Sequence, residues 1–468
     1  MKYFIFILLI IVFLPLGLSA QGAFPSFSQK LYIPPILESE GVERGVSIYK
    51  LRAQTGEVAF FGDKVTPTLG FNGDYLGPTI RLKRGQKVSI KVDNTLHEPT
   101  TVHWHGLHIP GEFDGGPHQI IGPGDIWNPV FTVNQEAATL WYHPHVMGTT
   151  AEQVYRGLAG LFIIDDENSV NLDIPGEYGI DDVPLIIQDR RFFEDGTFAY
   201  NPSRSDIMHG IIGNTITVNG TVQPYLEVPN SLVRFRILNG SNSSLYKISL
   251  SDGSSFSQIA SDGGFLEKAV KLDYSVLSPG ERAEIIVDFT TLYGKDVFLK
   301  VEIYNGREFE ALKFKITNNY SDSIENIPDR LNRILKIPES EADISRRFVM
   351  QTGMGSFSIN GKKMDMSRID EIVSLGDTEI WEIYNRPMGM MQIPHSFHIH
   401  DVQFQILDRN GVLPSPVESG WKDTVLIWPG ETVRFITKFE DYTGIYMYHC
   451  HFLEHEDDGM MGQFEVRP

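Results

Sequence analysis

One pattern occurs three times along this chain. An alternating run of apolar and polar residues ends in asparagine, and its three copies occupy residues 78–94, 224–239 and 372–385. A Pro-Gly-acid tripeptide follows each copy, at residues 123–125, 279–281 and 429–431. Alternation with a period of two is typical of β-strands that bury one face. Repetition of such a unit predicts three equivalent all-β domains.

The repeats define the expected domain boundaries. We expect the three β-domains to occupy residues 21–168, 169–317 and 348–468. The polar and charged stretch 318–347 is expected to be a linker between the second and the third domain.

The first residues predict the compartment. Lys2 precedes an apolar run, and residues 18–20 (Leu-Ser-Ala) have the small-residue ending of a signal-peptide cleavage site. The run is short of the roughly 20 apolar residues of a membrane anchor, and Pro15 interrupts it. We therefore expect residues 1–20 to be a signal peptide. We expect the mature protein to be exported, periplasmic or secreted, without a membrane span and monomeric. A net charge of -20 argues against nucleic acid as a partner.

The only cysteine of the chain, Cys450, can form no internal disulfide. It lies in His449-Cys-His451, at the same place in the repeat as His143-Pro-His145 in the first unit. Each of these units has a second His-x-His motif upstream, at residues 103–105 and 398–400, whereas the second unit has none. Residues i and i+2 of a strand share a face, so four such motifs present eight imidazoles. Such a donor set suits copper, zinc or nickel.

The thiol of Cys450 points away from its two histidine neighbours on the strand and must serve a different site. His395, His455 and Met460 can complete that site, because two histidines, a cysteine and a weak thioether form the trigonal blue-copper arrangement. The corresponding residues of the first unit cannot act in this way; they are Thr100, Pro144, Thr149 and Val154. We therefore expect one such site, in the third domain.

Four motifs together resemble the copper motifs of the multicopper oxidases. They are His103-Trp-His-Gly106, Trp141-Tyr-His-Pro-His145, His395-Ser-Phe-His-Ile-His400 and His449-Cys-His-x3-His-x4-Met460. The resemblance implies three consecutive cupredoxin-like Greek-key β-sandwich domains and four copper ions: one type 1, one type 2 and two type 3. The implied ligands are His395, Cys450, His455 and Met460 for type 1; His103 and His398 for type 2; and His105, His143 and His451, with His145, His400 and His449, for the type 3 pair.

The implied reaction takes electrons one at a time at the type 1 copper and reduces dioxygen to water at the other three. Oxygen reduction consumes protons, and the resemblance assigns their supply to Asp114 and Glu456. Glu454, Asp457 and Asp458 are expected to be ordinary surface charges.

The electron donor stays open between phenols or aromatic amines and Cu(I). Met388, Met390 and Met391 lie just before His395, and thioethers bind cuprous ion well, so they form a candidate substrate site. Two other functions are alternatives to the oxidase. A copper nitrite reductase would not need the eight-imidazole set, and a non-catalytic cupredoxin scaffold should have broken ligand sets, whereas none is broken here.

Overall fold

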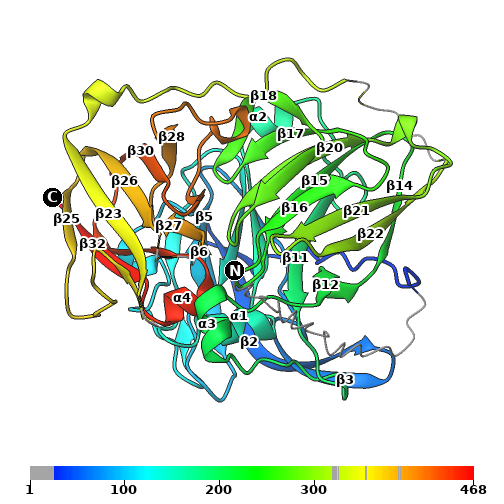
Figure 1. Ribbon diagram of the computed structural model, residues 1–468, viewed down its shortest axis with the longest axis horizontal. Coiled ribbons are helices and arrows are strands. Elements are labelled where there is room, and N and C mark those ends of the chain that lie inside the picture. Colours follow the sequence, from blue (N-terminus) through cyan, green and yellow to red (C-terminus); the bar gives the residue numbers. More distant parts are fainter. Residues whose placement is uncertain (1–25, 319–323, 325, 354–355, 388, 390–391) are drawn as a thin grey trace, which may run out of the picture.

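The computed structural model describes residues 26–468 except 319–323, 325, 354–355, 388 and 390–391, so the predicted signal peptide lies outside the described residues. The described chain forms three consecutive cupredoxin-like β-sandwiches, which confirms the predicted fold class. Figure 1 shows the third sandwich (yellow to red) beside the second (green), with the first (blue to cyan) between and below them.

The first sandwich packs a six-stranded sheet on a four-stranded sheet. The larger sheet contains β1 (Gly41–Glu43), β2 (Val46–Phe61), β3 (Lys64–Phe71), β5 (Lys87–Asn94), β7 (Ile126–Trp127) and β8 (Val130–Thr132). The smaller contains β4 (Ile80–Lys83), β6 (His103–His105), β9 (Ala138–His143) and β10 (Gly160–Asp165). Leu51 and Ile90 of the larger sheet and Leu82 and Trp104 of the smaller one are fully buried between them.

The second sandwich has sheets of seven and five strands. The larger contains β11 (Asp182–Arg190), β12 (Thr215–Val218), β13 (Thr221–Val222), β15 (Leu232–Asn239), β17 (Phe256–Ser261), β18 (Gly264–Leu272) and β20 (Arg282–Asp288). The smaller contains β14 (Tyr225–Val228), β16 (Tyr246–Leu250), β19 (Tyr274–Leu277), β21 (Val297–Ile303) and β22 (Glu308–Ile316).

The third sandwich has two sheets of five strands. One contains β23 (Ile344–Gly353), β24 (Ser356–Ile359), β26 (Thr378–Arg386), β28 (Phe404–Arg409) and β30 (Thr432–Lys438). The other contains β25 (Glu371–Ser374), β27 (His395–Ile399), β29 (Thr424–Ile427), β31 (Gly444–Cys450) and β32 (Met461–Arg467). Cys450 and Met460 belong to the buried cluster between these sheets.

The repeat predicted from the sequence is visible in the strand order. One sheet of each sandwich contains the same four-strand series, β4-β10-β9-β6, β14-β22-β21-β16 and β25-β32-β31-β27. In every copy the first pair is parallel and the other two pairs are antiparallel. The His-x-His motifs therefore occupy equivalent strands of the first and third sandwiches, β6 with β9 and β27 with β31.

The asparagine that ends each sequence repeat has a structural role. Each of these buried side chains donates through Nδ2 to two backbone carbonyls; they are Asn94, Asn239 and Asn385. The backbone carbonyl of each one accepts from the N–H of the glycine in the following Pro-Gly-acid tripeptide. Those glycines have φ values between +80° and +86°, a region that favours glycine. The repeat therefore encodes one turn, used three times.

Short helices connect the strands. The α-helices are α1 (Thr150–Arg156), α2 (Glu167–Asn171), α3 (Arg204–His209) and α4 (Leu453–Asp457), and the 3₁₀-helices are η1 (Gly111–Phe113), η2 (Phe289–Thr291), η3 (Glu339–Glu341) and η4 (Pro416–Glu418). Within the described part of the chain, none of these helices has the length and apolar character needed to cross a membrane.

Two segments differ from the expected domain boundaries. Lys30, placed by sequence in the first domain, pairs with Tyr225 of the second sandwich, and Leu31 is buried in the core of that sandwich. The stretch 318–347, expected to be a linker, already contains the start of β23 at Ile344, and its Leu331 is buried against the second sandwich. Apolar residues in both segments explain the difference, because they pack on the nearest exposed sheet.

Candidate metal centres

Two groups of buried histidines lie at the two faces of strand β31. On one face, the thiol of Cys450 lies 3.5 Å from His395 Nδ1 and 3.7 Å from His455 Nδ1. All three side chains are buried, and their donor atoms lie within 4.8 Å of one another. Met460 is fully buried beside them, and its backbone is hydrogen-bonded to both Cys450 and His455. The structure thus brings together the four residues predicted for the type 1 site.

Burial governs the protonation of this group in the absence of metal. It raises the pKa of the Cys450 thiol to about 12 and lowers the pKa of His395 to about 3. Burial and the neighbouring His395 also lower the pKa of His455. The imidazoles are therefore neutral and ready to bind a cation, whereas the thiol must lose a proton when metal binds.

On the other face, strand pairing aligns the remaining histidines. His103 lies opposite His143 in the β6–β9 pair, and His398 lies opposite His449 in the β27–β31 pair. The two sandwiches then meet through stacked rings. The ring centroids of His103 and His400 are 3.8 Å apart, and those of His105 and His398 are 3.7 Å apart. All eight predicted cluster histidines are at least 99% buried.

The eight histidines form three groups, two of which share His105, and within each group the donor atoms lie within 4.8 Å of one another. The groups are His105, His143 and His451; His145, His400 and His449; and His103, His105 and His398. The first two correspond to the predicted type 3 sets, and the third contains both predicted type 2 ligands. In the second set, Nε2 of His449 lies 3.2 Å from Nε2 of both His145 and His400, so three nitrogens converge on one point.

Hydrogen bonds to the far ring nitrogen orient most of these imidazoles. Nδ1 of His103, His143, His398 and His449 is bonded to the backbone carbonyl of Asp114, Pro144, Asp423 and Cys450, respectively. The opposite nitrogens of His103, His143 and His398 are buried and have no hydrogen-bond partner among the described residues. An outer carbonyl or carboxylate on one nitrogen is the usual way to aim the other at a metal.

The charge state of the cluster also suits a cation. Burial, together with neighbouring imidazoles, lowers the pKa well below its usual value for His105, His143, His145, His398, His400 and His451. Neutral imidazoles are the form that ligates metal.

Both predicted acids lie at the cluster. Asp114 Oδ2 accepts a hydrogen bond from His400 Nδ1 at 2.8 Å, and Asp114 Oδ1 lies 3.5 Å from His103 Nδ1. The carboxylate of Glu456 lies 3.2 Å from His449 Nδ1 and 3.4 Å from His145 Nδ1. Burial would raise the pKa of Glu456, but these two histidines hold it below its usual value.

The expectation that Glu454 and Asp457 are surface charges is wrong. Glu454 is 4% exposed and accepts a hydrogen bond from Asn242 of the second sandwich. Asp457 is largely buried and accepts from the first backbone N–H groups of α1. Both acids lie on α4, which packs against α1 and α3 instead of facing solvent. Asp458 is partly exposed and pairs with Lys363.

The candidate substrate residues Met388, Met390 and Met391 lie outside the described residues.

Sequence reasoning missed Asp423, which contacts two cluster histidines. Its Oδ1 lies 3.0 Å from His105 Nε2, and its carbonyl accepts from His398 Nδ1 at 2.8 Å. The sequence does contain a signal for Asp423, because the charged pair Lys422-Asp423 directly precedes the apolar strand β29. Charged side chains next to a buried strand are rarely buried without a partner, so this pair predicts a buried polar contact.

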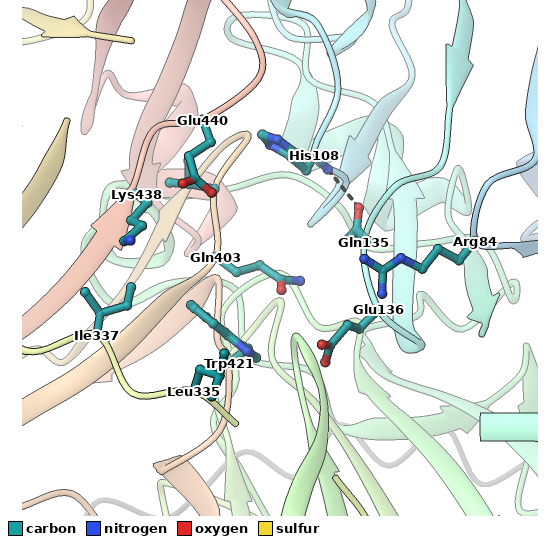
Figure 2. Close-up of a pocket in the computed structure, with 11 residues that line it drawn as sticks. Arg84, His108, Gln135, Glu136, Leu335, Ile337, Gln403, Trp421, Lys438 and Glu440 are labelled. Atoms are coloured by element: carbon teal, nitrogen blue, oxygen red, sulfur yellow. Dashed lines mark hydrogen bonds between the residues drawn. The ribbon is translucent and has the colours of Figure 1, made fainter. Parts of the chain in front are cut away.

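His108 is a partly buried histidine outside the predicted ligand sets. It lines a cavity of about 400 Å³ between the first and third sandwiches, where its backbone N–H bonds to Gln135 (Figure 2). Its Nδ1 bonds to the buried Asp401 at 2.8 Å. Burial alone would lower the pKa of His108, but the bonds to Asp401 and Asp441 raise it to about 9.

This pair predicts a pH-dependent stability. A histidine whose folded pKa exceeds its unfolded value stabilises the protein fully below about pH 6.5 and loses that effect as pH rises through 9. We expect His108→Gln to reduce the free energy of unfolding by about 2 kcal/mol more at pH 7 than at pH 10. Denaturant unfolding at both pH values measures this, with His97→Gln at an exposed position as control. An equal loss at both pH values would contradict the ion pair.

Comparison with known proteins gives the family. Profiles described as multicopper oxidase match residues 52–169 and 337–468. The multicopper oxidase mco of Staphylococcus haemolyticus is 40% identical over 448 residues, covering 96% of this chain and 94% of that protein. The cell division protein FtsP of Pectobacterium atrosepticum is 37% identical, covering 97% and 95%. The crystal structure of a laccase from Pediococcus acidilactici superposes with a TM-score of 0.88 at 39% identity, covering 95% of each chain. The protein therefore belongs to the multicopper oxidase family.

Proposed function

We propose that this protein is an oxidase with four copper ions that takes electrons from a small reducing substrate and reduces dioxygen to water. One observation supports the proposal most strongly: every predicted ligand set is complete, buried and brought together. In this assignment the type 1 ion is held by His395, Cys450, His455 and Met460, and the type 2 ion by His103 and His398. The type 3 ions are held by His105, His143 and His451, and by His145, His400 and His449.

The donors fit copper better than other metals. A thiol with two imidazoles and a nearby thioether is the blue-copper combination, and imidazole-only sets suit copper at the cluster. The buried ring nitrogens without a hydrogen-bond partner fit this assignment, since an unpaired buried polar atom is costly unless it binds something.

Bound copper would supply one-electron redox chemistry at Cys450 and dioxygen reduction at the histidine cluster. The chain provides the connection between the two sites, because Cys450 lies directly between His449 and His451 on β31. A second connection is the hydrogen bond of 3.1 Å from His449 Nδ1 to the carbonyl of Cys450. The carboxylates of Asp114 and Glu456 are placed to hold and deliver protons at the two sides of the cluster.

The test is copper loading followed by three measurements on the same sample. We expect four coppers per chain, an intense blue absorption from the Cys450 thiolate, and oxygen consumption driven by an aromatic amine or by Cu(I). A fully loaded protein without blue absorption or without oxygen consumption would refute the proposal.

Similarity to proteins named cell division protein FtsP favours a second candidate, a cupredoxin-fold protein with a binding or scaffold role. Such a protein needs no complete copper set. Copper binding at fewer than four sites, with no oxygen consumption, would support this candidate. A copper nitrite reductase is disfavoured because it would not use the eight-histidine cluster.

Export to the periplasm or the outside of the cell is part of the proposal, and residues 1–20 are the sequence feature that supports it. Cleavage after Ala20 should be visible in the mass of the protein recovered from the exported fraction.

The substrate class can be separated with the methionines before His395. If Met388, Met390 and Met391 form a Cu(I) site, replacing all three by leucine should raise the apparent KM for Cu(I), because substrate contacts are lost. Oxidation of aromatic amines should be unchanged or faster, and folding should change little because the apolar volume is kept. Steady-state rates with both donors measure this. Equal Cu(I) oxidation by the variant and the wild type would leave the methionines with a packing role only.

A further inference from the structure

The second sandwich carries no predicted metal ligand, yet one of its residues binds Asp423, which contacts the cluster. Arg282, the first residue of β20, is 1% exposed and uses all five of its N–H donors. Nε donates to the carbonyl of Thr139 at 2.9 Å. Nη1 donates to the carbonyl of Gly280 at 3.0 Å and Nη2 to that of Asp262 at 3.0 Å. The two remaining donors bind the Asp423 carboxylate at 2.7 and 2.6 Å.

These acceptors belong to all three sandwiches. Thr139 is part of the first, Gly280 and Asp262 are part of the second, and Asp423 is part of the third. A single guanidinium therefore holds the three sandwiches together at one buried point. A fully hydrogen-bonded planar fork permits little movement of the groups it binds.

Asp423 transmits this contact to two of the proposed copper ligands. Its Oδ1 receives both the Arg282 donor and the bond from His105 Nε2, and Nδ1 of His105 has no hydrogen-bond partner in the described part of the chain. Its carbonyl accepts from Nδ1 of His398, whose Nε2 likewise has no partner among the residues that the structure describes. The rings of His105 and His398 stack with an interplanar angle of 8°. Asp423 thus contacts both rings of a stacked pair of imidazoles, one from each metal-binding sandwich, and the hydroxyl of its neighbour Thr424 lies 3.1 and 3.2 Å from the same two nitrogens.

The other contacts of Arg282 also lead to the cluster. Thr139 lies on β9, the strand that ends at His143. Gly280 packs so closely on His451 that an added Cβ would lie 3.0 Å from the ring. The second sandwich therefore borders the cluster directly at Gly280 and indirectly through the bonds of Arg282 to Asp423.

We propose that Arg282 and Asp423 form a positioning pair through which the second sandwich fixes His105 and His398 for copper binding. The inference rests on the proposed four-copper function. Asp423 binds the histidines directly and Arg282 acts through Asp423, so neither residue is assigned a contact with substrate.

Arg282→Lys tests the pair, because lysine keeps the charge but replaces the two-pronged fork by a point donor. We expect affinity for the cluster coppers to fall about 10- to 100-fold, the range typical of lost outer-shell contacts. The electron paramagnetic resonance signal of the type 2 copper should shift, whereas the blue absorption of the Cys450 site should keep its position and intensity.

Arg236→Lys is the matched control. Arg236 is a buried arginine of the same sandwich, and it also contacts Thr139, but its ion pairs are with Asp182 and Glu284 rather than with Asp423. A weakened interface between sandwiches should affect both variants alike, whereas loss of ligand positioning should appear in Arg282→Lys alone.

Asp423→Asn provides a second variant if Arg282→Lys folds poorly. It should give the same loss of cluster copper and the same shift of the type 2 signal, with the blue absorption retained. Combining it with Arg282→Lys should add little, because both changes break one interaction. The inference is overturned if the Arg282 and Arg236 variants change the cluster signals equally, or if Arg282→Lys and Asp423→Asn leave them unchanged. Failure of the wild type to show four coppers would instead refute the proposed function.

Discussion

Replacing Cys450 by serine is expected to abolish the blue absorption and to lower oxygen consumption to the background rate with every donor. Serine keeps the size of the side chain but removes the thiolate that binds the proposed type 1 copper. Because the Cys450 thiolate joins the proposed type 1 copper to the backbone that carries His449 and His451, electrons would have no short route to the cluster without it. Visible absorption, copper content and oxygen uptake measure the three effects.

The histidine cluster should keep most of its copper in this variant, since its ligands lie on the other face of β31. Met461→Leu is a suitable control, because Met461 is buried next to Met460 and the substitution preserves volume. Retention of the blue absorption after Cys450→Ser would refute the type 1 assignment. Loss of all copper would show that the two sites do not bind independently.

Asp114→Asn is expected to slow oxygen reduction by about 100-fold or more, the range for loss of a general acid or base. Asparagine keeps the shape of the side chain and can still contact His400, but it cannot deliver a proton from the position 2.8 Å from His400 Nδ1. Reduction of the type 1 copper should be unaffected, because electrons arrive there before protons are needed at the cluster.

Stopped-flow absorption separates these two steps. Bleaching of the blue absorption under anaerobic reduction should match the wild type, whereas its return on mixing with oxygen should be slow. Glu112→Gln, at an exposed acid in the same loop, should behave as the wild type. Slow bleaching with normal reoxidation in Asp114→Asn would contradict the assigned role.

The sequence by itself determined the β-strand repeat and the composition of both candidate centres. Alternation fixes which residues of a strand share a face, so the placement of Cys450 opposite to His449 and His451 follows from local geometry alone. The position of each His-x-His motif within its repeat predicted its strand, and β6, β9, β27 and β31 carry these motifs or end in them.

Only the tertiary structure decided how the sandwiches meet. The stacking of His105 on His398, the contact of Asp423 with the His105 ring and the bonds of Arg282 to Thr139 and Asp423 join residues separated by more than one hundred positions. The burial of Glu454 against Asn242 and of Leu31 in the second sandwich has the same origin. Local periodicity specifies the faces of a strand, but the docking of one domain on another depends on the shape and charge of both surfaces. No short stretch of sequence contains that information, so the candidate ligands could be predicted but not Asp423 and Arg282, which position two of them.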